Sequence, residues 1–123
     1  MNLSKAEEQL MEIIWKRGKA FMKDIIESYA EPKPAGTTIA TLLKRMQNKG
    51  VIAYKLFGNS RQYYPLIKKD DYFTKHIGEL VEGFFGNSAL QFASFFTTTS
   101  NLSERELQEL KKIVEQEIRR KKQ

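Results

Sequence analysis

The stretch Thr37-Thr38-Ile39-Ala40-Thr41-Leu42-Leu43-Lys44-Arg45-Met46-Gln47-Asn48 has the clearest helical pattern in the chain. Its large apolar residues recur at positions i, i+3, i+4 and i+7, which predicts a helix over about 35–49 with one buried stripe. The opposite face carries neither a carboxylate nor a large apolar group; it presents Thr37, Ala40, Thr41, Lys44, Arg45 and Asn48. We therefore expect a helix that is anchored on one side and offers a polar, cationic surface on the other.

Two helical patterns precede this segment. Ser4 and Glu7 have the spacing of a capping box, and apolar residues follow at helical intervals until Lys16-Arg17-Gly18. A second, shorter helix is expected from Phe21 to about Tyr29, and Pro32 and Pro34 should end it because proline disfavours helix in the residue before it.

A β-hairpin is expected after the helix. Residues 51–57 and 61–66 are rich in β-branched and aromatic side chains, and Gly58-Asn59-Ser60 between them is a turn-forming triplet. Three helices followed by a two-stranded wing give a winged helix-turn-helix, in which the third helix enters the major groove of DNA. The expected DNA-contacting residues are Thr37, Thr38, Thr41, Lys44, Arg45 and Asn48 on the helix, and Lys55 and Arg61 on the wing.

The charge distribution agrees with an anionic partner. The formal net charge is +6, and residues 1–66 carry +5 of it. Between Glu31 and Asp70 there is no acidic residue, whereas eight basic residues are present. Such a stretch suits a polyanion, because each neutralised phosphate releases a counterion. A solvated basic face without a partner is the alternative on charge alone.

The composition changes after Pro65, since six of the eight phenylalanines follow it. Helices are expected over about 72–84 and 89–96, then a polar loop from Thr97 to Asn101. A last helix should start at the second capping box, Ser103 and Glu106, and fray into a disordered basic tail. About 55 residues in three helices cannot bury this many aromatic groups alone. A dimer interface is preferred over a ligand pocket or internal packing, with the interface residues expected to be Phe73, Leu80, Phe84, Phe85, Leu90, Phe92, Phe95, Phe96, Leu107, Leu110 and Val114. The predicted fold is mainly α with a small β-hairpin wing, divided into a DNA-binding domain (1–68) and a helical dimerisation domain (69–123).

Several classes of function are disfavoured. The chain has no cysteine, which removes disulfides, thiolate metal sites and a cysteine nucleophile. His76 is the only histidine, and Asp70-Asp71 fits a helix start rather than a catalytic pair. No signal peptide or membrane span is evident. We expect a cytoplasmic protein that is not an enzyme and uses no cofactor, metal or membrane, with Trp15 as a packing anchor.

The whole chain resembles the penicillinase and methicillin-resistance repressors. The resemblance is carried by Leu3-Ser4-Lys5-Ala6-Glu7, Met11-Glu12-Ile13-Ile14-Trp15, Thr38-Ile39-Ala40-Thr41-Leu42-Leu43-Lys44-Arg45-Met46, Lys49-Gly50 and Gln62-Tyr63-Tyr64-Pro65-Leu66, and more loosely by Leu102-Ser103-Glu104-Arg105-Glu106-Leu107. It implies a homodimer that binds a palindromic DNA operator and represses a resistance operon. The implied recognition positions are Thr37, Thr38, Thr41, Lys44 and Arg45, and Ala40 stands where the family often has arginine.

The resemblance also bears on induction. In antibiotic-responsive members, a membrane-linked sensor protease system leads to cleavage of the dimerisation segment at an Asn-Phe bond. This chain has no Asn-Phe, and the nearest candidates are Gln91-Phe92 and Ser94-Phe95. Copper-responsive relatives use a C-terminal cysteine cluster, which this chain lacks.

The sequence thus predicts a sequence-specific transcriptional repressor of a resistance or stress operon. The alternative is a winged-helix protein-interaction module that does not bind DNA. A docking module would tolerate carboxylates or exposed apolar groups on the outer face of 37–48, and neither is found there.

Overall fold

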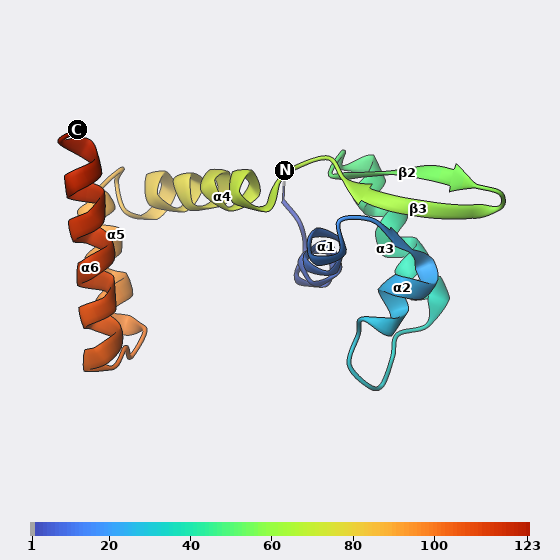
Figure 1. Cartoon of the computed structure of the whole chain (residues 1–123), viewed down its shortest axis with the longest axis horizontal. Helices are drawn as coiled ribbons and strands as arrows, with labels where there is room; N and C mark the ends of the chain where they lie inside the picture. The colour runs from blue at the N-terminus through green and yellow to red at the C-terminus, as the bar shows by residue number, and fades with distance from the viewer. Residues whose placement is uncertain (1) are drawn as a thin grey trace. The chain divides into compact units, whose positions relative to one another are not determined.

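The structure is a computed structural model that describes residues 2–123. The chain forms two compact units, one ending at Thr74 and the other spanning Lys75–Gln123. The N-terminal unit contains α1 (Lys5–Arg17), β1 (Ala20–Phe21), α2 (Met22–Glu27), α3 (Gly36–Asn48), β2 (Ile52–Phe57) and β3 (Ser60–Pro65). The prediction of a winged helix-turn-helix followed by three helices is confirmed (Figure 1).

Helix α1 begins and ends where its sequence predicts. The Ser4 hydroxyl accepts a hydrogen bond from the Glu7 backbone N–H, and the Glu7 carboxylate accepts one from the Ser4 backbone N–H, so the capping box is formed. At the other end Gly18 adopts a φ of 76°, a conformation that glycine reaches without steric cost. Its N–H donates to the carbonyl of Ile14 and closes the last turn.

Helix α2 ends at Glu27, earlier than the prolines predicted. The Ser28 hydroxyl donates to the carbonyl of Asp24, and the Lys33 ammonium donates to the carbonyls of Glu27 and Tyr29. Lys33 thus satisfies the carbonyl of Glu27, the last residue of the helix, and the helix stops before Pro32 limits it.

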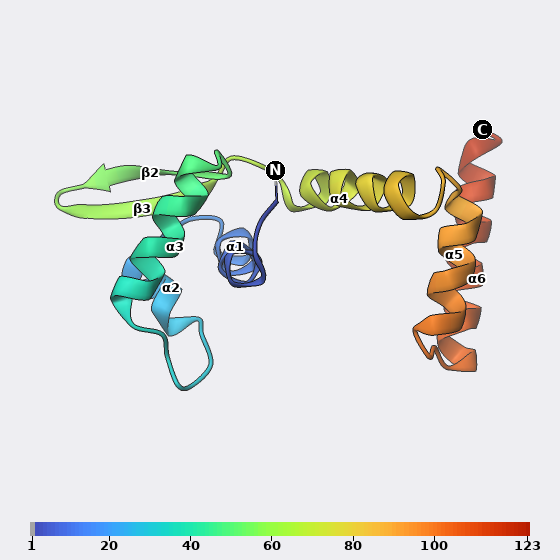
Figure 2. The same ribbon diagram turned by 180° about the vertical axis from the view of Figure 1, so that it is seen from behind.

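The hairpin is confirmed, but the sheet has a third strand that we did not predict. Strand β3 lies between β2 and β1, and both pairs are antiparallel. Strand β1 contributes only Ala20 and Phe21, which pair with Tyr63 and Gln62. Strands β2 and β3 follow the end of α3 in the chain and project from the N-terminal unit as the wing (Figure 2).

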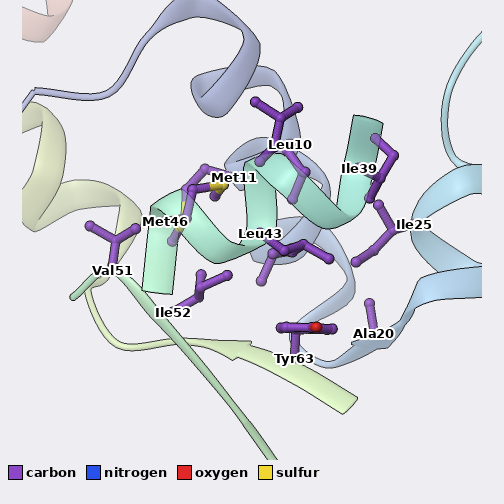
Figure 3. Packing of buried hydrophobic residues seen from close by; sticks show 12 residues of the cluster. Leu10, Met11, Ala20, Ile25, Ile39, Leu43, Met46, Val51, Ile52 and Tyr63 are labelled. Atoms are coloured by element: carbon purple, nitrogen blue, oxygen red, sulfur yellow. The ribbon is translucent and has the colours of Figure 1, made fainter. Parts of the chain in front are cut away.

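The core of this unit lies between the helices and the sheet (Figure 3). The predicted stripe of α3, namely Ile39, Leu42, Leu43 and Met46, is buried in it. Leu10, Met11 and Ile14 come from α1, and Ile52 and Tyr63 come from the strands. Because α3 is fixed along this stripe, its opposite side faces solvent.

The C-terminal unit consists of the rest of α4 (Lys69–Phe84), then α5 (Ala89–Thr99) and α6 (Glu104–Lys121). Two of our predictions here are wrong. Residues 97–99 are helical, and the Thr97 and Thr98 hydroxyls are satisfied within the helix because they donate to carbonyls one turn back. The basic end is also helical to Lys121, because cations favour the negative end of the helix dipole.

The start of α6 agrees with the sequence, since Ser103 and Glu106 form the second capping box. No helix within residues 2–123 has both the length and the apolar character needed to cross a membrane.

Candidate nucleic-acid interface

The outer face of α3 is exposed along its whole length. Thr37, Thr38, Thr41, Lys44, Arg45 and Asn48 are all exposed, as is Ala40 between them. The Thr41 hydroxyl already donates to the carbonyl of Thr37 at 3.0 Å. Thr41 therefore offers its methyl group and the lone pairs of its oxygen, rather than a free donor, to a ligand in this conformation.

The wing places its two predicted cations on opposite faces. Lys55 pairs with Gln62 across the hairpin, whereas Arg61 pairs with Leu56. Successive residues of a strand alternate between faces, so Lys55 and Arg61 point away from each other. Both are exposed, but one flat surface cannot contact both.

Arg61 is held by two tyrosines, Tyr54 and Tyr63, for which we predicted no contact with it. Its guanidinium carbon lies 4.4 Å from the centre of the Tyr54 ring, a cation–π geometry. A hydrogen bond with Tyr63 and the charge interaction with Tyr54 raise the pKa of Arg61 above its ordinary value. The sequence could have indicated this contact, because antiparallel pairing of the predicted hairpin places four residues on one face: Tyr54, Leu56, Arg61 and Tyr63.

Three of the eight basic residues between Glu31 and Asp70 are engaged within the fold. Lys33 binds backbone carbonyls at and just after the end of α2, Lys49 binds Glu7, and Lys69 lies 2.6 Å from a carboxylate oxygen of Glu12. The other five have no carboxylate partner within 4.0 Å in the described part of the chain: Lys44, Arg45, Lys55, Arg61 and Lys68. Four of these five lie on α3 and the wing, and Lys68 follows β3.

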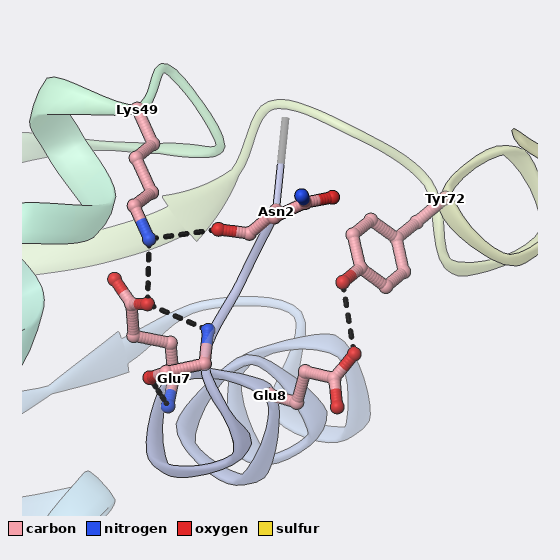
Figure 4. A network of polar contacts seen from close by, with 6 residues as sticks. Asn2, Glu7, Glu8, Lys49 and Tyr72 are labelled. Carbon is pink, nitrogen blue, oxygen red and sulfur yellow. Dashed lines mark hydrogen bonds and ion pairs between the residues drawn. The ribbon is translucent and has the colours of Figure 1, made fainter. Parts of the chain in front are cut away.

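An ion pair between the buried Glu7 and the exposed Lys49 connects the end of α3 to the start of α1 (Figure 4). Glu7 is only 1% exposed, and its Oε1 lies 2.7 Å from Lys49 Nζ, which also donates to the carbonyl of Asn2. Burial alone would raise the pKa of Glu7, but hydrogen bonds from Lys49 and Ser4 outweigh it and hold the pKa below its ordinary value. This pair joins Lys49, directly after α3, to the first turn of α1, in addition to the core contacts of the α3 stripe.

The first turn of α4 is anchored to the N-terminal unit. The Tyr72 hydroxyl donates to Glu8 Oε2 at 2.9 Å, and the Trp15 indole N–H donates to the carbonyl of Ile67 at 2.8 Å. The rings of Tyr72 and Phe73 lie 5.8 and 6.0 Å from that of Trp15. Trp15 is thus a packing anchor, and Phe73, which we expected in a dimer interface, contacts Trp15 within its own chain.

The C-terminal unit leaves most of its large apolar side chains exposed to solvent. No residue in 75–123, all of which the structure describes, is buried. Phe85 and Phe92 are half-buried, with ring centres 5.5 Å apart, and Leu110 is also half-buried. The remaining predicted interface residues of this unit are exposed: Leu80, Phe84, Leu90, Phe95, Phe96, Leu107 and Val114. More than four-fifths of the surface of Phe84 and of Leu90 is exposed.

A helix with a cationic, carboxylate-free outer face, fixed on two others and followed by a basic wing, defines the winged helix-turn-helix class, whose members place that helix in the major groove. The penicillinase repressor family matches residues 3–116, so the chain belongs to that family. It is therefore a transcriptional repressor rather than an enzyme or a protein-docking module, as the sequence predicts.

Individual relatives agree with this assignment. The chain is 32% identical over 117 residues to the methicillin resistance regulatory protein MecI of Staphylococcus aureus (strain N315), with 91% of this chain and 92% of the relative covered. It is 27% identical over 122 residues to the penicillinase repressor of Bacillus licheniformis, with 98% and 95% covered. The solved DNA-binding domain of the repressor BlaI is similar with a TM-score of 0.51 and 29% identity, covering 58% of this chain and 88% of that domain.

Proposed function

We propose that the chain is a homodimeric repressor that binds a palindromic operator, with α3 of each copy in a major groove. The observation that carries this proposal is the outer face of α3, which is exposed, cationic and free of carboxylates. Thr37, Thr38, Thr41, Lys44, Arg45 and Asn48 lie on it and would contact base edges and the backbone. Lys55 and Arg61 on the wing would contact DNA beside that groove.

The paired form is supported by the C-terminal unit. Its helices α5 and α6 contain no buried residue in the single chain, although they carry Phe95, Phe96, Leu107 and Val114. A second copy would cover these groups, because the interfaces of obligate homodimers resemble a domain core cut in half. Two recognition helices held in this way would bind two half-sites with the avidity of a linked pair.

The regulated genes are proposed from the relatives. Because similar proteins are named for methicillin resistance and penicillinase repression, we propose that the operator controls a resistance or stress operon. We also propose that the protein lies in the cytoplasm, where such an operator lies, and that a sensor protease system acts on its C-terminal segment. The Gln91-Phe92 and Ser94-Phe95 bonds both lie inside α5, so cleavage there would require this helix to unwind locally.

Duplex binding tests the proposal directly. A binding site would be selected with the purified chain from a pool of random duplexes, and its affinity would be measured over a range of salt concentrations. We expect an inverted repeat, and a log–log salt slope of about 0.9 per neutralised phosphate. Recovery of no preferred sequence, or a flat salt response, would contradict the proposal.

Matched charge variants locate the interface. We expect Lys44→Gln and Arg45→Gln each to weaken binding about three- to tenfold and to lower the salt slope by about one. Lys33→Gln removes the same charge from a side chain that binds carbonyls at and just after the end of α2, so it should leave the slope unchanged. Equal losses from Lys33→Gln and Arg45→Gln would indicate a diffuse charge effect instead of a site on α3.

A further inference from the structure

Arg61 has surroundings that differ from those of the other wing cation. It follows Ser60 at the start of β3, close to the hairpin turn, and it is exposed. Its guanidinium lies over the Tyr54 ring, and it has no carboxylate within 4.0 Å in the described part of the chain. The arginine is therefore held in place by an aromatic ring, while its positive charge remains available to a ligand.

The register of the hairpin indicates how the wing would meet DNA. Lys55 and Arg61 lie on opposite faces, so a wing lying flat on one phosphate strand would use only one of them. A wing whose tip enters a groove would present one cation to each wall. The groove next to the major groove occupied by α3 is a minor groove, into which other DNA-binding proteins also place basic residues.

Arginine is suited to that position by its chemistry. Stretches of A·T pairs have a narrow minor groove with an enhanced negative potential, which attracts inserted cations. The planar guanidinium sheds water more readily than an ammonium group, so it enters such a groove at lower cost than lysine. Its contact with Tyr54 also reduces the conformational freedom that would be lost on binding.

We propose that Arg61, supported by Tyr54, recognises the minor groove beside the α3 site and makes the repressor prefer operators with A·T-rich flanks. This inference rests on the proposed function. It assigns to Arg61 a role in sequence preference, whereas Lys55 on the other face contributes charge alone.

The test uses the full-length protein and three versions of the selected duplex that differ only in the flanking pairs under the wing. The flanks are A·T, G·C and inosine·C. An inosine·C pair lacks the guanine 2-amino group, so it resembles A·T in the minor groove while keeping the major-groove pattern of G·C. We expect the wild-type protein to bind the A·T and inosine·C versions about fivefold more tightly than the G·C version.

Four variants separate recognition from charge. Arg61→Lys keeps the charge and should reduce the flank preference to less than about twofold. Tyr54→Phe keeps the ring and should retain the preference, whereas Tyr54→Leu removes the ring and should lose most of it. Lys55→Gln should weaken binding to all three duplexes equally and retain the preference.

The outcomes distinguish this inference from the proposed function. If no sequence is preferred anywhere in the duplex, the proposed function fails. If the operator is bound but Arg61→Lys keeps the wild-type flank preference, the assignment to Arg61 is wrong. If inosine·C behaves like G·C, the flank is recognised from the major groove, which also overturns the inference.

Discussion

Glu7 shows how a single buried residue supports the recognition helix from a distance. Its carboxylate accepts hydrogen bonds from Lys49 after α3 and from the backbone of Ser4 before α1, and its Oε2 is buried without a partner within residues 2–123. We expect Glu7→Gln to lower the free energy of unfolding by about 1–3 kcal/mol, because Lys49 then loses its carboxylate partner. Urea unfolding followed by the fluorescence of Trp15, the only tryptophan, measures this change.

The same pair predicts the response to acid. The pKa of Glu7 is lower in the folded protein than its ordinary value of 4.5, so the ion pair contributes its full stability above pH 4.5. That contribution is lost as the pH falls through the lowered pKa. Below pH 4.5 the wild-type stability should therefore approach that of Glu7→Gln. Glu31→Gln, at an exposed position, is the control, and an equal loss of stability from it would contradict a special role for Glu7.

At the scale of elements, the first turn of α4 is attached to α1 through Tyr72. Burial, then the hydrogen bond to the Glu8 carboxylate, raises the pKa of Tyr72 to about 12. Tyr72→Phe should cost about 1 kcal/mol at neutral pH, since it leaves Glu8 without this donor. A phenol with a raised pKa favours the folded state while it stays neutral, so wild-type stability should fall as the pH rises from about 10 to about 12. Unfolding free energies over that range should show a smaller fall for Tyr72→Phe, and equal falls would contradict the assignment.

How much of each element the sequence predicts depends on how local its cause is. The α3 stripe and the capping boxes of α1 and α6 follow from residues a few positions apart, and all three are confirmed. Strand β1 could not be predicted, because two residues carry no period and form a strand only by pairing with β3. Within the site, the exposure of Lys44 and Arg45 can be predicted from the spacing of the apolar residues in α3, which places both cations on the opposite face. The ion pairs of Lys49 with Glu7 and of Lys69 with Glu12 cannot, because each partner is far away in the sequence and is brought close only by folding.

At the scale of the whole molecule, the two units differ in how much of their apolar surface is buried: the N-terminal unit buries it in a core, whereas the C-terminal unit leaves most of it exposed. The N-terminal unit encloses a core of its own, from Leu10 on α1 to Tyr63 on β3. The C-terminal unit has half-buried phenylalanines but no buried residue. Because Tyr72 and Phe73 pack on Trp15, the N-terminal compact unit includes the first turn of α4 and continues to Thr74. A truncation that removes Tyr72 would therefore damage the fold as well as any pairing.

Truncation after Thr74 should separate folding from pairing. We expect residues 1–74 to fold as a monomer and to bind a palindromic operator far more weakly than the full chain, since the link between two half-sites is lost. In the full chain, Val114→Lys should weaken the dimer because it places a charge on an apolar face of α6, whereas Gln116→Lys alters a polar position of the same helix and should not. Sedimentation at micromolar concentration and operator titration measure both effects. A monomeric wild-type chain, or a truncated form that binds the palindrome as tightly as the full chain, would show that the C-terminal unit does not pair the repressor.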